Sequence, residues 1–328
     1  MRSFTRRSVL AAGAASAALL SAPAVFAQAK TKLRFTTVAT EQDIRAESFK
    51  AFGEAVKDRF DFEPFFGGNL FKQGTELVAL QRGNLEMGNI APQDIANQIP
   101  AWSIVTAAYL FRDADHLAKF FASDLGAEMK QMADDKLGIH ILGPTYFGAR
   151  QIGLKPNKKI NTPADLAGIK LRMPPGEAWQ FLGESLGANP TAMAYAEVYT
   201  GLQTGAIDGQ DNPLPNVENM KFYEVMSQIV MTSHLVGFDL LTVSSKVWKA
   251  MSPEVQKRFQ AAATSAIDFS TQKHRTREKE LVELFKSKGL QIYEPDQAAF
   301  RKHAQQKYLA SDLAKDWPKG MVDKINAL

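Results

Sequence analysis

The chain of 328 residues contains no cysteine, which excludes a disulfide scaffold, a zinc–thiolate site and a cysteine nucleophile. Its five histidines are scattered, and none of them has the spacing of a metal site. The Gly-x-x-x-x-Gly-Lys-Ser/Thr loop that cradles nucleotide phosphates is also missing. We therefore expect no catalytic residue, no metal and no cofactor. An exported hydrolase is the alternative from the enzyme class.

Long apolar runs are missing too, except at the start of the chain. Arg6 and Arg7 directly precede residues 9–27, which are rich in alanine and end in small side chains. A charged start, a short apolar run and a small-residue exit make up a secretory signal, and the arginine pair indicates twin-arginine export. We predict a signal peptide over residues 1–27, cleaved after about Ala27, and hence a periplasmic protein. The alternatives are a membrane anchor, disfavoured by the mild hydrophobicity, and an ordinary secretory signal.

The mature chain also lacks a strong excess of charge. Arg2, Arg6 and Arg7 lie in the predicted signal peptide with no acidic residue, so its removal lowers the formal net charge from +4 to about +1. That balance gives no support for binding nucleic acid or an anionic membrane surface. The remaining chain of about 300 residues is long for one simple core, which indicates two lobes.

Strand-like and helix-like segments alternate through the mature chain. The first stretch predicts strands at 33–38, 60–66 and 85–90, with helices at 41–58 and 72–83. The second predicts strands at 139–143, 152–154, 170–173, 188–193 and 207–210, with helices at 177–186 and 197–204. This alternation indicates an α/β fold with helices on the faces of parallel or mixed sheets. After Pro253, about 35 residues without proline or glycine predict one long helix that runs along both lobes.

Three segments of the second half resemble a known family. They are Lys170-Leu171-Arg172-Met173-Pro174, residues 195–213 (YAEVYTGLQTGAIDGQDNP) and residues 221–225 (KFYEV). These residues are similar to the substrate-binding proteins of TRAP (tripartite ATP-independent periplasmic) transporters of the DctP type. Residues 67–70, 80–83 and 148–151 fit the same family, so the resemblance covers essentially the whole mature chain.

The resemblance implies a two-lobed α/β receptor with the periplasmic-binding-protein fold. We expect residues 28–149 with 238–277 to form lobe I, and residues 150–237 with 278–328 to form lobe II. Such a receptor has no enzymatic activity, closes around a small organic carboxylate and delivers it to separate membrane permease subunits. We expect it to be a monomer. A receptor that presents its ligand to a membrane sensor is a further alternative.

Arg172 is the residue that we expect to hold the carboxylate of the ligand. It ends a short predicted strand before Pro174, and ligands of parallel α/β sheets lie beyond the carboxyl ends of strands. Its planar guanidinium fits both oxygens of a carboxylate. From position alone, a structural ion pair with Asp165 or Glu177 is the alternative. The resemblance implies the ligand role.

The resemblance adds three helpers, which are a second guanidinium at Arg150, an amide at Asn212 and an aromatic wall at Tyr195. The alternatives are that Arg150 braces an acid, that Asn212 turns back on its own backbone, and that Tyr195 is a core residue. Asp211 is expected to be a structural acid.

Four more candidates follow from their places in the predicted elements. Trp179 and Phe147 are candidate aromatic walls, and Gln93 and Gln73 are candidate polar contacts in the first lobe. Sialic-acid members of the family often carry a polar residue where this chain has Pro175, and their acidic first-lobe contacts are replaced here by Ala-Pro-Gln at residues 91–93. We therefore expect a compact or partly aromatic monocarboxylate rather than a nine-carbon sugar acid. The sequence does not choose among aromatic acids, 2-oxo acids, dicarboxylates and sugar acids.

Overall fold

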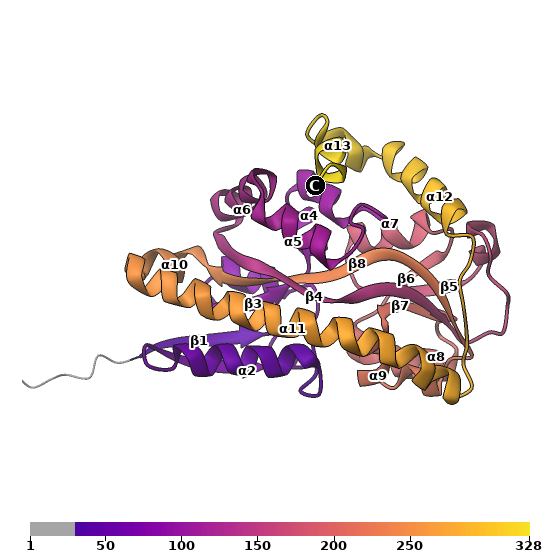
Figure 1. The fold of residues 1–328 in the computed structure, drawn as a ribbon, viewed down its shortest axis with the longest axis horizontal. Helices are drawn as coiled ribbons and strands as arrows, with labels where there is room; N and C mark the ends of the chain where they lie inside the picture. The colour runs from indigo at the N-terminus through magenta and orange to yellow at the C-terminus, as the bar shows by residue number, and fades with distance from the viewer. Residues whose placement is uncertain (1–29) are drawn as a thin grey trace, which may run out of the picture. The chain divides into compact units, whose positions relative to one another are not determined.

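A mixed β-sheet forms the centre of the computed structural model, which describes residues 30–328 (Figure 1). The predicted signal peptide at 1–27 lies outside the described residues. The strands follow the order β2-β1-β3-β8-β4-β7-β5-β6, and β9 pairs with β8. Their bounds are β1 Thr31–Thr36, β2 Phe60–Phe65, β3 Met87–Ile90, β4 Ile139–Leu154, β5 Lys170–Met173, β6 Asn189–Ala192, β7 Gly209–Pro213, β8 Gln228–Ser244 and β9 Gln291–Tyr293.

Two long strands, β4 and β8, run through the middle of the sheet and pair with each other antiparallel. β3 pairs with β8 at residues 240–243, whereas β7 pairs with β4 at residues 150–154. The short strands at the two ends of the sheet are therefore attached to opposite ends of the same long pair. The sequence predicted two separate strands within β4 and none at β8, and this expectation is wrong. Register shifts, one of them between Tyr146 and Gly148, interrupt the pairing and hide the alternation that a continuous strand would show.

α-Helices cover the sheet, with α5, α6, α12 and α13 on one side and α2, α8, α9 and α11 on the other (Figure 1). Their bounds are α2 Ile44–Val56, α3 Glu76–Gln81, α4 Pro92–Ala96, α5 Ala114–Ala122, α6 Asp124–Leu137, α7 Glu177–Ser185, α8 Val198–Thr204, α9 Leu214–Asn219, α10 Ser245–Ala250, α11 Pro253–Ser287, α12 Gln297–Leu309 and α13 Met321–Asn326. The α/β prediction is confirmed. No helix within residues 30–328 has the length and apolar character needed to cross a membrane.

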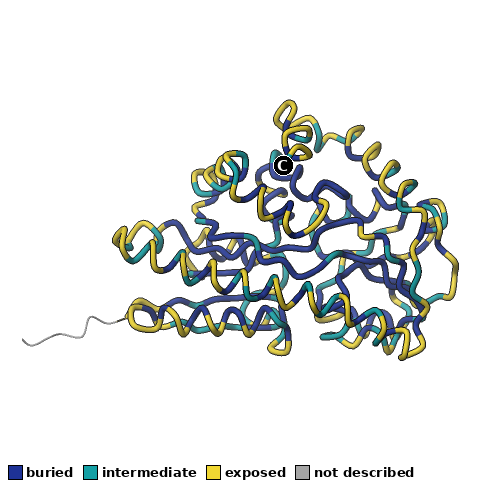
Figure 2. The backbone as a smooth tube through the Cα atoms, viewed as in Figure 1, coloured by how far each residue is buried: buried dark blue, intermediate teal, exposed yellow. Residues whose placement is uncertain are grey.

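The long helix α11 has 35 residues, as the sequence predicted. The side chain of Ser252 accepts a hydrogen bond from the Val255 amide, and Pro253 occupies the first turn, where its missing N–H costs nothing. Phe259 of this helix belongs to an apolar cluster with β1, β2 and α2, while Phe285 belongs to a second cluster with α8 and α9. One helix therefore contributes to the cores at both ends of the sheet, and its outer face is exposed (Figure 2).

Replacing Phe285 with alanine should lower the free energy of unfolding by about 3–5 kcal/mol, because its ring is fully buried. Phe269→Ala on the same helix is the control, since that ring is only partly buried, and it should cost roughly 1 kcal/mol. Urea unfolding followed by circular dichroism measures both. Equal losses would contradict the assignment of Phe285 to the core.

Candidate ligand-binding site

One cavity collects side chains from elements that lie far apart in the chain. Counted to its opening, it has a volume of about 490 Å³. It is lined by Val38, Arg45, Gln73, Glu76, Asn89, Ala91, Asp94, Phe147, Arg150, Arg172, Pro174, Trp179, Tyr195, Asn212, Asn216 and Asp239. Seven of the eight residues that the sequence proposed as ligand contacts are in this set, and the eighth, Gln93, is not. The cavity is therefore the candidate site.

Arg172 lies in β5 with its guanidinium in the cavity wall. Its Nε donates a hydrogen bond to the Met193 carbonyl at 2.8 Å, and one terminal nitrogen donates to Oε1 of Gln73 at 3.0 Å. A guanidinium has five N–H groups, so three of them have no partner within residues 30–328. These three N–H groups can take both oxygens of a carboxylate.

The charge of Arg172 is buried without a compensating acid. The side chain is 1% exposed, and within the described residues it forms no ion pair. The alternative pairing with Asp165 or Glu177 is not formed, and Asp165 instead accepts hydrogen bonds from the backbone of its own turn. Burial, together with the positive charge of Arg150, lowers the pKa of Arg172 to about 9. The guanidinium is still charged at neutral pH, and an anion in the cavity would compensate it.

Arg150 both lines the cavity and braces an acid. Its Nε donates to Oδ1 of Asp211 at 2.9 Å, and a terminal nitrogen donates to the Asp211 carbonyl. The guanidinium lies over the indole of Trp179, 4.7 Å from the ring centre. The two roles that the sequence left open are therefore compatible.

Asp211 is fully buried and holds the second arginine in place. The same Oδ1 lies 3.0 Å from Nε2 of His234, whose Nδ1 lies 2.7 Å from the Thr232 hydroxyl. Although burial opposes ionisation, the charges of Arg150 and His234 hold the pKa of Asp211 at about 2. Asp211 is thus the structural acid that the sequence suggested.

Asn212 and Tyr195 complete this side of the cavity. The Asn212 side-chain amide donates to Oε1 of Gln210 at 2.7 Å, so its nitrogen is not used in a turn with its own backbone. The Tyr195 hydroxyl accepts from Nδ2 of Asn216 at 3.1 Å, which fixes the ring against the cavity. Oδ1 of Asn216 is buried without a partner in the described residues.

Three carboxyl groups line the cavity from the first half of the chain and from β8. Glu76 begins α3, Asp94 lies in α4 and Asp239 lies in β8. Burial raises the pKa of Glu76 to about 7 and that of Asp239 to about 6. Burial and the neighbouring negative charges of Glu76 and Asp239 raise the pKa of Asp94 well above its ordinary value. Oε2 of Glu76 is buried and has no hydrogen-bond partner within residues 30–328.

A third arginine, Arg45, differs from Arg172 because acids neutralise it. Its Nε and one terminal nitrogen donate to both carboxylate oxygens of Asp43, at 3.0 and 2.8 Å. Its other terminal nitrogen donates to Oδ2 of Asp239 at 2.9 Å, and Nδ2 of Asn89 donates to the same oxygen at 3.0 Å. Arg45 therefore holds the Asp239 carboxylate in the wall.

The structure corrects two expectations about the first half of the chain. Gln93 does not line the cavity, because on α4 successive side chains point about 100° apart and Asp94 faces it instead. The acidic contacts that seemed absent are supplied by Glu76, Asp94 and Asp239. Glu76 and Asp94 look like ordinary acids of first helical turns in the sequence. Asp239 lies in a strand that the sequence did not predict, so no local signal identified it.

One short motif has the spelling of a hydrolase nucleophile elbow. Residues 183–187 read Gly-Glu-Ser-Leu-Gly, which matches Gly-x-Ser-x-Gly. However, Ser185 is the last residue of helix α7, is fully buried, and donates its hydroxyl to the Leu182 carbonyl at 2.7 Å. An elbow requires an exposed serine on a strand-to-helix turn, so this serine is structural.

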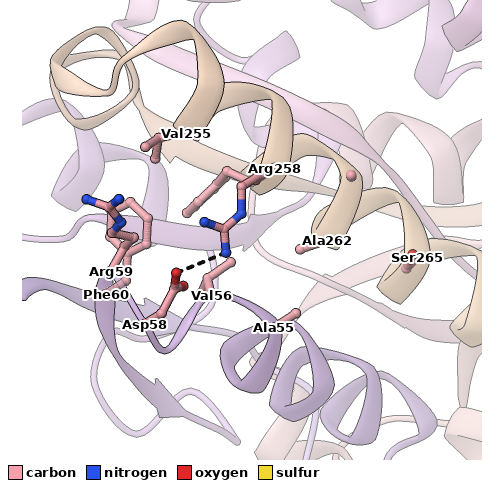
Figure 3. A pocket seen from close by; sticks show the side chains of 11 residues that line it. Ala55, Val56, Asp58, Arg59, Phe60, Val255, Arg258, Ala262 and Ser265 are labelled. Atoms are coloured by element: carbon pink, nitrogen blue, oxygen red, sulfur yellow. Dashed lines mark hydrogen bonds and ion pairs between the residues drawn. The ribbon is translucent and has the colours of Figure 1, made fainter.

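A second hollow lies between the end of α2 and the start of α11 (Figure 3). Its walls are mostly alanine, valine and phenylalanine side chains, and an ion pair of 2.9 Å joins Asp58 to Arg258 at its edge. None of the predicted contact residues lies there. It has no buried charge that would attract a ligand of defined chemistry.

Comparisons with known proteins agree with one another. The family model described as bacterial extracellular solute-binding protein, family 7 (DctP) matches residues 35–313. The sialic acid-binding periplasmic protein SiaP of Vibrio cholerae is 36% identical over 230 residues, which are 70% of each chain. A solute-binding protein of Roseobacter denitrificans is 30% identical over 315 residues, or 95% of each chain.

Solved structures show the same fold. A TRAP periplasmic solute-binding protein from Roseobacter denitrificans with bound 3-deoxy-D-manno-oct-2-ulosonic acid is 43% identical, with a TM-score of 0.89 over 91% of this chain and 99% of that one. Another from the same organism, with bound β-D-glucuronate, is 26% identical, with a TM-score of 0.83 over 90% of this chain and 99% of the other.

Glu76 should make the stability of the unliganded protein depend on pH. Its pKa is about 7 in the fold against an ordinary value of 4.5, so the folded state holds a proton that the unfolded chain releases between these values. Stability from this group is therefore lost as pH rises from about 4.5 to 7. Glu76→Gln should match the wild type near pH 4.5 and exceed it by up to about 3 kcal/mol at pH 8.

Urea unfolding across that pH range tests this expectation. Glu128→Gln, at an exposed position of α6, is the matched control and should leave the difference from wild type constant with pH. A constant difference for Glu76→Gln would show that its carboxyl is solvated in the folded protein.

Proposed function

The chain belongs to family 7 of the bacterial extracellular solute-binding proteins and is a solute-binding receptor of the TRAP type, and from this premise we propose that its ligand is a sugar acid. The observation that carries the proposal is the polarity of the cavity. A buried arginine without an acidic partner lies in one wall, and three carboxyl groups line the same cavity. A molecule with a carboxylate at one end and hydroxyl groups along its length fits both.

The carboxylate is proposed to bind at Arg172. Three unpartnered N–H groups of this guanidinium can donate to both carboxylate oxygens, and charge-assisted bonds are stronger than neutral ones. Arg150 adds a second positive charge in the same cavity, held by Asp211 and Trp179. The Asn212 side chain supplies a neutral polar group beside them.

The hydroxyl groups are proposed to bind at the acidic wall. Ionised carboxylates accept hydrogen bonds, and protonated carboxyls both donate and accept, so Glu76, Asp94 and Asp239 suit a row of hydroxyls in either state. The unpartnered Oε2 of Glu76 is a ready acceptor. This reverses the sequence-based expectation of a compact or aromatic monocarboxylate. Relatives solved with bound sugar acids agree with the revised ligand class.

The binding mechanism is proposed to be hinge closure between two lobes, residues 28–149 with 238–277 and residues 150–237 with 278–328. The long strands β4 and β8 and the helix α11 contain every crossing but one implied by these bounds, and few dihedral changes there would reorient the lobes. A ligand that contacts both lobes has a higher affinity for the closed form and shifts the population toward it. The closed receptor, a periplasmic monomer, would then deliver the sugar acid to the membrane permease.

A thermal-shift screen tests the ligand class. A sugar acid such as 3-deoxy-D-manno-octulosonate at a hundred times its dissociation constant should add about 2.7 kcal/mol and raise the midpoint by several degrees. Arg172→Ala should abolish this shift while the unliganded midpoint is kept, because the lost charge has no acidic partner. Arg258→Ala, at the exposed ion pair of Figure 3, is the control and should keep the shift. If no carboxylate moves the wild-type midpoint, the proposal is wrong.

Asp94→Ala should separate the two ends of the ligand. It should weaken binding of a sugar acid by roughly tenfold, because a hydrogen bond to a charged group is lost. Binding of lactate, which has a single hydroxyl beside its carboxylate, should change by less than about twofold if it binds at Arg172. Calorimetric titration of both acids measures the difference. An equal loss for the two ligands would contradict an acidic wall that recognises hydroxyls.

A further inference from the structure

Gln73 makes an unusual pair of contacts for a residue in a loop. It precedes α3, in the proposed lobe I, and is partly buried. Its Oε1 accepts a hydrogen bond from the Tyr195 backbone amide at 2.8 Å and another from the Arg172 guanidinium at 3.0 Å. Both donors belong to the proposed lobe II. One amide oxygen therefore joins the two lobes at the arginine that we propose for the ligand's carboxylate.

Asn97 makes a second contact of the same kind. It directly follows α4, in the proposed lobe I, and its Oδ1 accepts a hydrogen bond from the Ala178 amide in the first turn of α7 at 3.2 Å. Gly176 permits this approach. A Cβ at this glycine would lie 2.7 Å from Nδ2 of Asn97, and the backbone there has a φ of +114° that other residues rarely adopt.

Both contacts use neutral amides, and the chemistry of Gln73 depends on this. A neutral acceptor orients one N–H of Arg172 and leaves its charge for the ligand, since three N–H groups stay unpartnered in the described residues. A carboxylate at the same place would neutralise the guanidinium and compete with the ligand.

We propose that Gln73 and Asn97 form a two-point latch that holds the lobes closed over the cavity, and that Gln73 is a positioning residue for Arg172. The proposal rests on the two-lobed division given above. The latch explains why polar side chains of two separate loops end on the opposite lobe rather than in solvent.

The absence of cysteine in the sequence allows a direct test on the full mature chain. Ala51→Cys in α2 and Gln203→Cys in α8 place spin labels at exposed positions, one in each proposed lobe (Figure 1). Double electron–electron resonance then measures the distance between the lobes without any ligand. The latch variants in this background are Gln73→Ala, Asn97→Ala and Gln73→Glu. Gln81→Ala is the control, because Gln81 pairs with Gln98 at the surface of one lobe.

Gln73→Ala and Asn97→Ala should each raise the ratio of open to closed molecules by roughly tenfold, as expected for the loss of one net hydrogen bond to a buried or charged group. Gln73→Glu should act in the opposite direction and favour the closed form, because its carboxylate pairs with Arg172. It should also weaken binding of 3-deoxy-D-manno-octulosonate by tenfold or more. Gln81→Ala should leave the distances unchanged.

Opposite shifts for Gln73→Ala and Gln73→Glu support the latch, since a loss of packing alone would move both variants the same way. Shifts in the same direction, or no shift for Gln73→Glu in a variant whose circular dichroism shows it to be folded, would overturn it. The distances are measured without ligand, so they decide the latch even if 3-deoxy-D-manno-octulosonate does not bind the wild type. Failure of that binding would instead count against the proposed ligand.

Discussion

A buried guanidinium without an acidic partner is costly, and the arrangement around Arg172 is built on that cost. Removing a charge from water is tolerated when an opposite charge or several hydrogen bonds compensate it. Arg172 has two hydrogen bonds and no carboxylate within the described residues, and Arg150 lies near enough to lower its pKa further. The two other buried arginines of the cavity, Arg150 and Arg45, are each paired with an acid. Arg172 is thus the place where an anion lowers the free energy most.

The sheet explains how such a site can be assembled from a chain of this length. Arg172 and Asn212 lie in β5 and β7, which are attached to one end of the β4–β8 pair. Asn89 lies in β3, which is attached to the other end, and Asp239 lies in β8 beside it. The short strands bring polar side chains to the cavity, while the long strands and α11 hold the two ends of the sheet together. A cavity between two such ends can change its width without breaking either core.

The charges in the cavity also indicate how ligand selection could work without catalysis. The acidic wall has raised pKa values, so its carboxyl groups change protonation within reach of neutral pH, whereas Asp211 stays ionised far below it. The environment separates these acids into two kinds. Those paired with arginine or histidine are structural, and those left in the wall face the ligand. Arg45 joins both kinds, because it binds Asp43 on one side and Asp239 on the other.

The sequence by itself determined the α/β class, the long helix and the family, because periodicity, capping and the ordered motif of residues 195–213 are local properties of the chain. It also identified Arg172, Arg150, Asn212 and Tyr195 as residues that would meet, through a motif that lies in consecutive elements. The tertiary structure decided the continuity of β4, the existence of β8 and the acidic wall. Bulges broke the alternation that announces a strand, and Glu76, Asp94 and Asp239 come from three elements whose meeting depends on long-range pairing. A chain pattern records which face a residue occupies, whereas the neighbour opposite that face is set by how the whole sheet folds.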